Sequence, residues 1–221
     1  MASTKSSART STEPHAAPSR SEGKEQTRQA LLGACLKLLA KHSFDSISLR
    51  EVTREAGVSP TAFYRHFEDM EELGMVLVED SLSAVRQMLR EARSVTNGEM
   101  RFTDSIETMV AFTLDHEMQL RFVARERHGG VRRLRRLIRS EIQLGVEELA
   151  IDLAQYDPVA TWPLEDRRVL AGALAEAVIL MAFDMPEASP ADRELIIRQT
   201  ERRMLLIMVG AQAWRPTRGS R

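Results

Sequence analysis

Residues 59–67, with the sequence SPTAFYRHF, place hydroxyl, phenol, guanidinium and imidazole groups within nine positions. On a helix that begins at Pro60, Phe63 and Phe67 share one face and are expected to point inward. The opposite face and its flanks carry Thr61, Ala62, Arg65, Tyr64 and His66. This outer face holds no acid, whereas a solvated helix usually mixes Glu and Lys. Its small residues and donors suit base edges and phosphates, so it is a candidate DNA-recognition helix. The alternative is an ordinary helical hairpin with a charged surface.

Local signals predict the elements that position this face. Ser48 and Glu51 have the spacing of a capping box, which begins a short helix. Gly57 supplies the left-handed turn that ends it. Ser59 is expected to cap the next helix, and Pro60 takes its first position. Two short helices joined by a tight turn are the arrangement of a helix-turn-helix motif.

The remaining sequence is typical of an all-α protein, because apolar and charged residues alternate at intervals of three and four. Residues 1–22 are mainly Ser, Thr, Pro and Ala, and we expect a disordered tail there. A three-helix domain is expected over 23–69, with its helix-turn-helix motif at 48–67, and a larger helical domain over 70–221. Helices are predicted from about 24 to the HSF segment at 42–44, then near 49–56, 70–93, 102–115, 118–127, 131–155, 164–183 and 191–213.

Charge and motif content exclude several classes of function. The net charge is −1, although residues 24–67 hold seven Lys or Arg against four Asp or Glu. A non-specific architectural DNA-binding protein is usually basic throughout, so this class is disfavoured. The sequence contains no Walker loop, GxSxG, HExxH or CxxC motif, and its five His do not cluster at metal-ligand spacing. We therefore expect no catalytic residue, no metal and no cofactor.

Cysteine usage and hydropathy predict a soluble cytoplasmic protein with no membrane partner. Cys35 is the only cysteine, which rules out an intrachain disulfide and fits a reducing compartment. It lies on an apolar stripe, so we expect a small buried side chain rather than a reactive thiol. The first ten residues lack the apolar core of a signal peptide. The longest apolar run, 169–183, is shorter than the ~20 residues that span a bilayer, and it contains Glu176.

The segment SLREVTREAGVSPTAFYRHFEDMEELG, with the helix before it, resembles the TetR family of bacterial repressors over roughly 24–80. The residue spacing, the helix caps and the Tyr-x-x-Phe ending all match the pattern of this family. FYRHFEDMEELG, and RERHGG at 125–130, are similar to the family's regulators of unsaturated fatty-acid synthesis. The rest of the chain is similar only in its helix layout. The resemblance implies a homodimer on a palindromic double-stranded DNA operator, and a C-terminal domain that dimerises and binds a small molecule.

The resemblance also implies roles for single residues at matching motif positions. Contacts with bases are implied for Thr61, Ala62 and Arg65. Contacts with phosphates are implied for Arg50, Ser59 and Tyr64, with His66 as a contact on the flank. These residues form the expected DNA-binding site.

Two C-terminal helices are candidates for the dimer interface. The helix near 164–183 is rich in Ala and Gly, which permits close approach of a second helix. The helix near 191–213 has a stripe at helical spacing, formed by Ile196, Thr200, Met204, Ile207, Met208 and Ala211. The alternative is that these stripes fill the core of a single subunit.

An apolar effector cavity is expected among the C-terminal helices, lined by Met109, Phe112, Phe122, Ile142, Val146, Leu149, Val178 and Met181. Residues 121–139 contain eight Arg and one acid, a local charge of +7. Arg binds phosphates through paired donors, so a phosphate site is expected at Arg132, Arg135, Arg136 and Arg139. An apolar cavity beside such a cluster suits a long-chain acyl-CoA. The alternative is a solvated Arg face paired with Glu141, Glu147 or the acidic fourth helix.

Taken with the resemblance, these features predict a sequence-specific repressor of lipid or fatty-acid metabolism genes, controlled by a small apolar effector of the acyl-CoA type. The alternative is a TetR-type repressor of an efflux operon or another metabolic operon with a ligand that is not a CoA ester. A cationic drug is disfavoured as ligand because of the positive Arg cluster.

Overall fold

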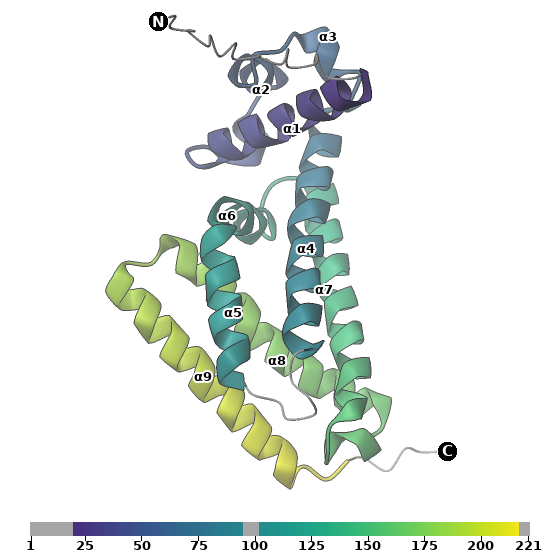
Figure 1. Cartoon of the computed structure of the whole chain (residues 1–221), viewed down its shortest axis with the longest axis vertical. Coiled ribbons are helices and arrows are strands. Elements are labelled where there is room, and N and C mark those ends of the chain that lie inside the picture. Colours follow the sequence, from purple (N-terminus) through teal and green to yellow (C-terminus); the bar gives the residue numbers. More distant parts are fainter. Residues whose placement is uncertain (1–19, 95–101, 217–221) are drawn as a thin grey trace, which may run out of the picture.

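The computed structural model describes residues 20–94 and 102–216. Within these ranges all regular secondary structure is helical, which confirms the all-α prediction. Figure 1 shows three helices grouped at one end of the molecule and a bundle of longer helices extending away from them. The terminal group consists of α1 (Arg20–Leu39), the 3-10 turn η1 (Phe44–Ser46), α2 (Leu49–Glu55) and α3 (Pro60–Phe63).

The bundle contains α4 (Met70–Ser94), α5 (Phe102–Asp115), α6 (Glu117–Glu126), α7 (Arg132–Asp152), α8 (Leu164–Asp184) and α9 (Pro190–Ala213). Three further 3-10 turns are η2 (Leu153–Gln155), η3 (Val159–Thr161) and η4 (Met185–Glu187). α4 packs against α7, α7 against α8, and α8 against α9, as Figure 1 shows. All six described α-helices of the bundle were predicted, and most of their boundaries agree within about two residues, whereas η3 and η4 lie in segments predicted to separate helices.

The first helix begins and ends a few residues earlier than predicted. It begins at Arg20, so residues 20–22, which were predicted to belong to a tail, are helical. Thr27 Oγ1 donates to the carbonyl of Gly23 at 2.8 Å within this first part of the helix. Once a helix is nucleated, each further residue adds one hydrogen bond at little cost, so the helix extends beyond its first buried residue. Residues 1–19 of the predicted tail lie outside the described residues.

One core joins the two parts of the molecule. Fully buried Leu31, Val52 and Phe63 of the N-terminal helices belong to the same cluster as Leu73 of α4 and Val123 of α6. A second cluster fills the far part of the bundle and draws on α5, α8 and α9. The DNA-binding helices are therefore packed directly on α4 and α6, which fixes their orientation relative to the bundle.

α8 contains a long apolar stretch. Its extension Leu164–Glu187 is the one helix among the described residues that is long and apolar enough to cross a membrane by length and composition. The apolar run at 169–183 covers only part of this helix, and by itself it is shorter than a membrane span. Helices at the centre of a protein core pass the same test, and α8 packs between α7 and α9.

Candidate DNA interface and effector cavity

The caps that position α2 and α3 are formed as predicted. Ser48 N–H donates to Glu51 Oε2 at 2.8 Å, and Glu51 N–H donates to Ser48 Oγ at 3.4 Å, which completes the capping box. Gly57 has φ of 69° and makes the turn after α2. Ala62 N–H donates to Ser59 Oγ at 3.2 Å at the start of α3. The helix-turn-helix geometry therefore rests on local hydrogen bonds that the sequence alone predicts.

α3 is one helical turn that continues as turns to Phe67. His66 N–H and Phe67 N–H both donate to the Phe63 carbonyl, at 2.9 and 3.0 Å. Phe63 and Phe67 are buried, as predicted, and their rings lie 5.5 Å apart. The side chains expected to face DNA are exposed or half-buried; exposed are Arg50, Ser59, Thr61, Tyr64 and Arg65, and half-buried are Ala62 and His66. The side chains predicted to contact DNA are therefore at least partly accessible to solvent.

His66 differs from its neighbours because its ring is turned partly inward. Its Nδ1 atom is buried and has no hydrogen-bond partner among the described residues. Burial is the largest cause that lowers the pKa of His66, and the nearby Lys24 and Arg28 lower it further. In the protein without DNA, the imidazole is therefore protonated less readily than an ordinary histidine.

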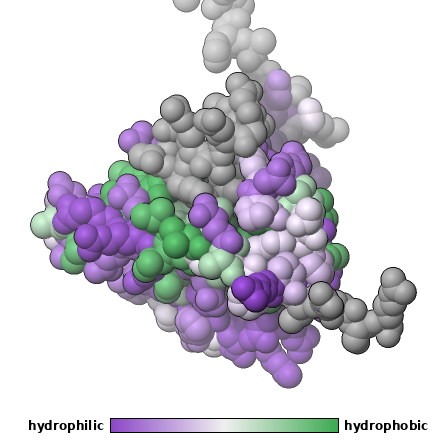
Figure 2. Space-filling model, turned by 90° about the horizontal axis from the view of Figure 1, so that it is seen from below, coloured by the Kyte–Doolittle hydropathy of each residue, from purple (hydrophilic) through white to green (hydrophobic). Residues whose placement is uncertain are grey.

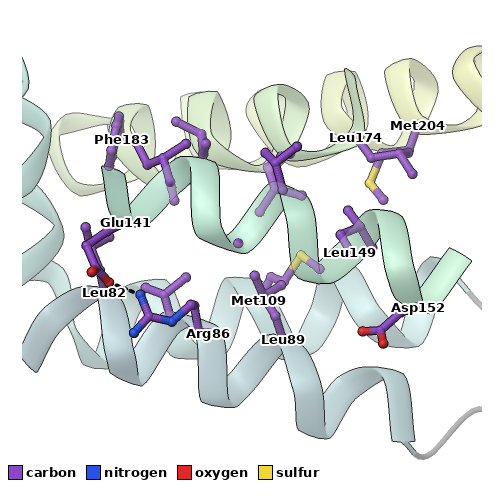
Figure 3. A pocket seen from close by; sticks show the side chains of 18 of the residues that line it. Leu82, Arg86, Leu89, Met109, Glu141, Leu149, Asp152, Leu174, Phe183 and Met204 are labelled. Carbon is purple, nitrogen blue, oxygen red and sulfur yellow. Dashed lines mark hydrogen bonds and ion pairs between the residues drawn. The ribbon is translucent and has the colours of Figure 1, made fainter. Parts of the chain in front are cut away.

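The bundle encloses an apolar cavity of about 160 Å³ between α4, α7 and α8. Five of the eight predicted apolar lining residues are in its wall: Met109, Ile142, Val146, Leu149 and Val178. Figure 3 shows the cavity from close by, with Leu89, Met109 and Leu149 around its middle. Almost the whole lining is apolar, so the site favours a hydrophobic ligand.

Three predicted apolar residues are not in the wall. Phe122 packs on Phe44, with ring centroids 5.8 Å apart, and so joins α6 to η1. Phe112 stacks on His116 with ring centroids 4.0 Å apart. Met181 is buried in the second core cluster. Helical spacing marked these residues as inward-facing but did not show which part of the interior each one faces.

The predicted phosphate site does not line the cavity either. Arg135 donates to the carbonyls of Gly129 and Gly130 and so closes the turn between α6 and α7. Arg132, Arg136 and Arg139 are exposed on α7. At 100° per residue these three lie on the side of α7 opposite Glu141, which faces the cavity.

The other arginines of the 121–139 run are mostly structural. Arg121 pairs with Glu117 at 2.6 Å, and Arg133 lies 3.5 Å from Glu71 of α4. Arg125 donates to the Leu39 carbonyl at 3.2 Å, which ties α6 to the end of α1. Arg127 lies over the Phe183 ring, 5.8 Å from its centroid. Of the partners named in the alternative, the acidic fourth helix pairs with Arg133, whereas Glu141 and Glu147 pair with Arg86 and Arg168, outside this run.

The polar residues of the cavity wall were not predicted from the sequence. These are Arg86, Glu141, Asp152 and Tyr156. The helical spacing of Leu82, Arg86 and Leu89 on α4 was a usable signal, since it places all three on one face. Outside the α7–α8 wall there is also an open groove of about 670 Å³, lined in part by Arg127 and Arg168.

The predicted stripe on α9 faces its own subunit. Thr200, Met204 and Ala211 are buried, and Ile196, Ile207 and Met208 pack against the second core cluster. A different face of α9 is exposed and apolar, formed by Leu195, Leu205, Leu206 and Val209. Val169 and Leu180 of α8 are exposed as well. Figure 2, seen from the end opposite α1–α3, shows hydrophobic residues gathered on part of that surface among hydrophilic ones.

Among the described residues, no group of three or more His, Cys, Asp or Glu side chains is placed to hold a metal ion. The candidate sites of the described chain are thus a polar outer surface at one end and an apolar cavity in the bundle.

Solved structures with the same fold include regulators with different ligands. The fatty acid degradation regulator FadR of Bacillus halodurans is 14% identical, with 82% of this chain and 94% of that chain covered and a TM-score of 0.63. FadR of Bacillus subtilis, solved with stearoyl-CoA, is 12% identical, with coverages of 81% and 96% and a TM-score of 0.56. SmeT, solved with triclosan, is 15% identical, with coverages of 83% and 90% and a TM-score of 0.66.

The sequence match to a known family lies in the helix-turn-helix region. Residues 31–74 match the profile described as bacterial regulatory proteins, tetR family. This range includes the C-terminal part of α1, all of α2 and α3, and the start of α4. The structure places both the predicted caps and the acid-free outer face within it. Residues 31–74 therefore form a helix-turn-helix domain that matches the tetR family of bacterial regulatory proteins.

Proposed function

We propose that this regulator is a homodimeric, cytoplasmic repressor that binds a palindromic operator, and that a long-chain fatty acyl-CoA controls it. It would act on genes of lipid or fatty-acid metabolism and have no enzymatic activity. The observation that carries the proposal is the apolar cavity, because one of its walls is α4. α4 also holds the DNA-binding helices through the shared core. A ligand that favours one position of α4 would shift the spacing of the two recognition helices.

The shape of the cavity supports an acyl chain. The wall residues on α7 run from Glu141 to Asp152, which is about 16 Å at 1.5 Å per residue. The enclosed volume of about 160 Å³ is smaller than the roughly 300–1,000 Å³ of most ligand sites. A long chain would therefore have to separate α4, α7 and α8 on binding, and this movement is what a regulator needs.

The predicted phosphate contacts remain part of this proposal. Arg132, Arg136 and Arg139 are exposed, and no ion pair of theirs is found among the described residues. With the acyl tail in the cavity, the CoA moiety would have to pass around α7 to reach them. The Bacillus subtilis FadR solved with stearoyl-CoA has the same overall fold, which is consistent with an acyl-CoA ligand.

A second candidate effector is a small apolar molecule without a CoA group, as in an efflux regulator. The enclosed volume is close to the roughly 150 Å³ of a cavity that binds benzene, so a compact ligand fits without helix movement. SmeT, which shares the fold, was solved with triclosan. This candidate predicts effector binding that does not depend on exposed arginines.

The test is to select an operator from random duplex DNA and then titrate the complex with effectors. Palmitoyl-CoA and oleoyl-CoA should change operator affinity, whereas free CoA should not. Charge reversal of Arg132, Arg136 and Arg139 to Glu should weaken the response to the CoA esters but not to free fatty acid. If free fatty acid acts as well as the thioester, or if the reversal has no effect, the CoA headgroup has no role. A response to triclosan alone would support the second candidate.

A further inference from the structure

The cavity wall is polar at both ends: a half-buried ion pair forms one end, and Asp152 lies at the other. Arg86 of α4 donates from Nη1 to Glu141 Oε2 of α7, and from Nη2 to Ser83 Oγ at 3.1 Å. Only 17% of each of the two charged side chains is exposed. Figure 3 shows the pair joined across the cavity near Phe183, while Leu174 and Met204 lie toward the other end.

Stability alone does not account for this pair. Removing two charges from water costs about as much as their attraction returns, so buried ion pairs are often no more stable than apolar replacements. α4 and α7 are already joined by a second pair, Arg90 and Glu148, at 3.2 Å. That pair is more exposed, at 53% and 33%, and neither residue lines the cavity. Arg86 and Glu141 thus place two charged groups in a wall where packing alone would favour apolar side chains.

The position of the pair matches a ligand with an oxygen at the end of an apolar chain. From the Arg86–Glu141 pair, the wall continues along α7 through Val146 and Leu149 as an apolar surface. A guanidinium has five donors, so it can hold a ligand oxygen beside or in place of Glu141. Carboxylates and ester-type carbonyls both accept such hydrogen bonds, and charged donors make the stronger ones.

We propose that Arg86 recognises the terminal acyl oxygen of the effector, and that this oxygen competes with Glu141 for the guanidinium. The proposal rests on the proposed function, because it requires an effector with an acyl chain. The competition would weaken the link between α4 and α7 when the ligand is bound. The oxygen can belong to a free carboxylate or to a thioester, and the two ligands are compared in the test.

The test uses calorimetric titration of the full-length protein with palmitate and with palmitoyl-CoA. Glu141→Gln removes the competing charge and should tighten palmitate binding by about tenfold. Arg86→Met removes the donor and should weaken binding of both ligands by about tenfold. Glu148→Gln and Arg90→Met alter the matched pair on the same two helices and should change affinity less than twofold.

Arg86→Met leaves Glu141 buried without its partner and can destabilise the fold. The double variant Arg86→Met with Glu141→Leu removes both charges and keeps the experiment informative. It should still bind the apolar chain but lose its preference for palmitate over 1-hexadecene, which lacks the oxygen. If it keeps that preference, or if the Arg90 and Glu148 variants have equal effects, Arg86 is not the recognition residue. If the unaltered protein binds no acyl ligand, both this inference and the proposed effector are wrong.

Discussion

Arg65 and Tyr64 are adjacent on α3, yet they should contribute differently to operator binding. Arg65→Ala should weaken specific binding by about 1–3 kcal/mol if its contact with a base is bidentate, and should relax discrimination at one base pair. Tyr64, which is 64% exposed, should act on phosphate. Tyr64→Phe should therefore weaken binding to all sequences alike. Affinity measured against a panel of single-base operator variants separates the two. Altered preference in the Tyr64 variant with none in the Arg65 variant would reverse the assignment.

Glu126 is buried at the contact between α6 and the DNA-binding helices, with 3% of the residue exposed. Its Oε1 accepts from Phe44 N–H at 3.4 Å, and its Oε2 has no partner among the described residues. Burial raises the pKa of this carboxyl, the Phe44 N–H partly offsets the rise, and Asp45 adds to it. The folded protein therefore holds the proton more tightly than the unfolded chain. Stability is lost as pH rises from the ordinary carboxyl range through the raised pKa.

Glu126→Gln should raise the thermal midpoint at neutral pH, because the variant has no charge to bury. The difference from the unaltered protein should shrink as pH falls toward about 4 to 5, where Glu126 is protonated. Glu201→Gln, on the exposed side of α9, is the control and should change nothing. Thermal denaturation across this pH range measures the effect. A gap that widens on acidification would show that burial is not the dominant cause.

Cys35 should be chemically inert in the folded protein. Burial raises the pKa of its thiol to about 12, and its side chain is part of the core between α1 and the other helices. Thiolate is the reactive form, so both its chemistry and its access are blocked. An aromatic disulfide reagent should label Cys35 only in denaturant, at the rate at which the protein unfolds. Rapid labelling of the native protein would contradict the predicted burial.

At the scale of single elements, α3 depends strongly on its cap, because it has only four helical residues. Ser59→Ala should cost about 1 kcal/mol of stability, and it should weaken DNA binding by loosening the outer face. Ser43, which precedes η1, makes no side-chain cap hydrogen bond, so Ser43→Ala is a matched control. Urea denaturation and operator titration of both variants give the comparison. Equal losses in the two variants would mean that the cap has no special role.

Elements defined by local signals were the ones that the sequence predicted well. The capping box, Gly57 and the Ser59 cap act between residues a few positions apart, so no tertiary information is needed to recognise them. The apolar stripe on α9 was also predicted, but the surface that buries it was not. A stripe at helical spacing shows that a face is buried, and it does not show whether its own subunit or a second copy buries it.

The arginine run was the least predictable part of the site. Its interactions depend on groups far away in the sequence, such as the Leu39 carbonyl for Arg125 and Glu71 for Arg133. The turn at Gly129 and Gly130 also sends α6 and α7 in different directions, so the eight charges do not form one patch. The cavity residues on α7 were found because their spacing is regular. Arg86 was missed because a charged residue on an apolar stripe resembles an ordinary surface position.

At the scale of the whole molecule, the DNA-binding helices and the cavity share α4. The N-terminal helices are held on the bundle by the packing of Phe44 on Phe122 and by the Arg125 hydrogen bond to Leu39. The N-terminal helices are therefore joined to the bundle through packed side chains. In a symmetric dimer each subunit would carry one recognition helix, so a ligand-induced change would act on both.

The exposed apolar faces of α8 and α9 are the surfaces that a dimer is expected to bury. Leu206 is 71% exposed, and burying one Leu contributes about 1.5–3 kcal/mol, counted twice in a two-fold interface. Leu206→Glu should therefore yield a folded monomer that no longer binds the palindrome, whose half-sites are about 34–36 Å apart. Ile151→Glu on α7, at a residue 63% exposed, is the matched control and should remain dimeric. Sedimentation and circular dichroism separate loss of assembly from loss of fold. A dimer that survives Leu206→Glu but not Ile151→Glu would move the interface from α8 and α9 to the end of α7.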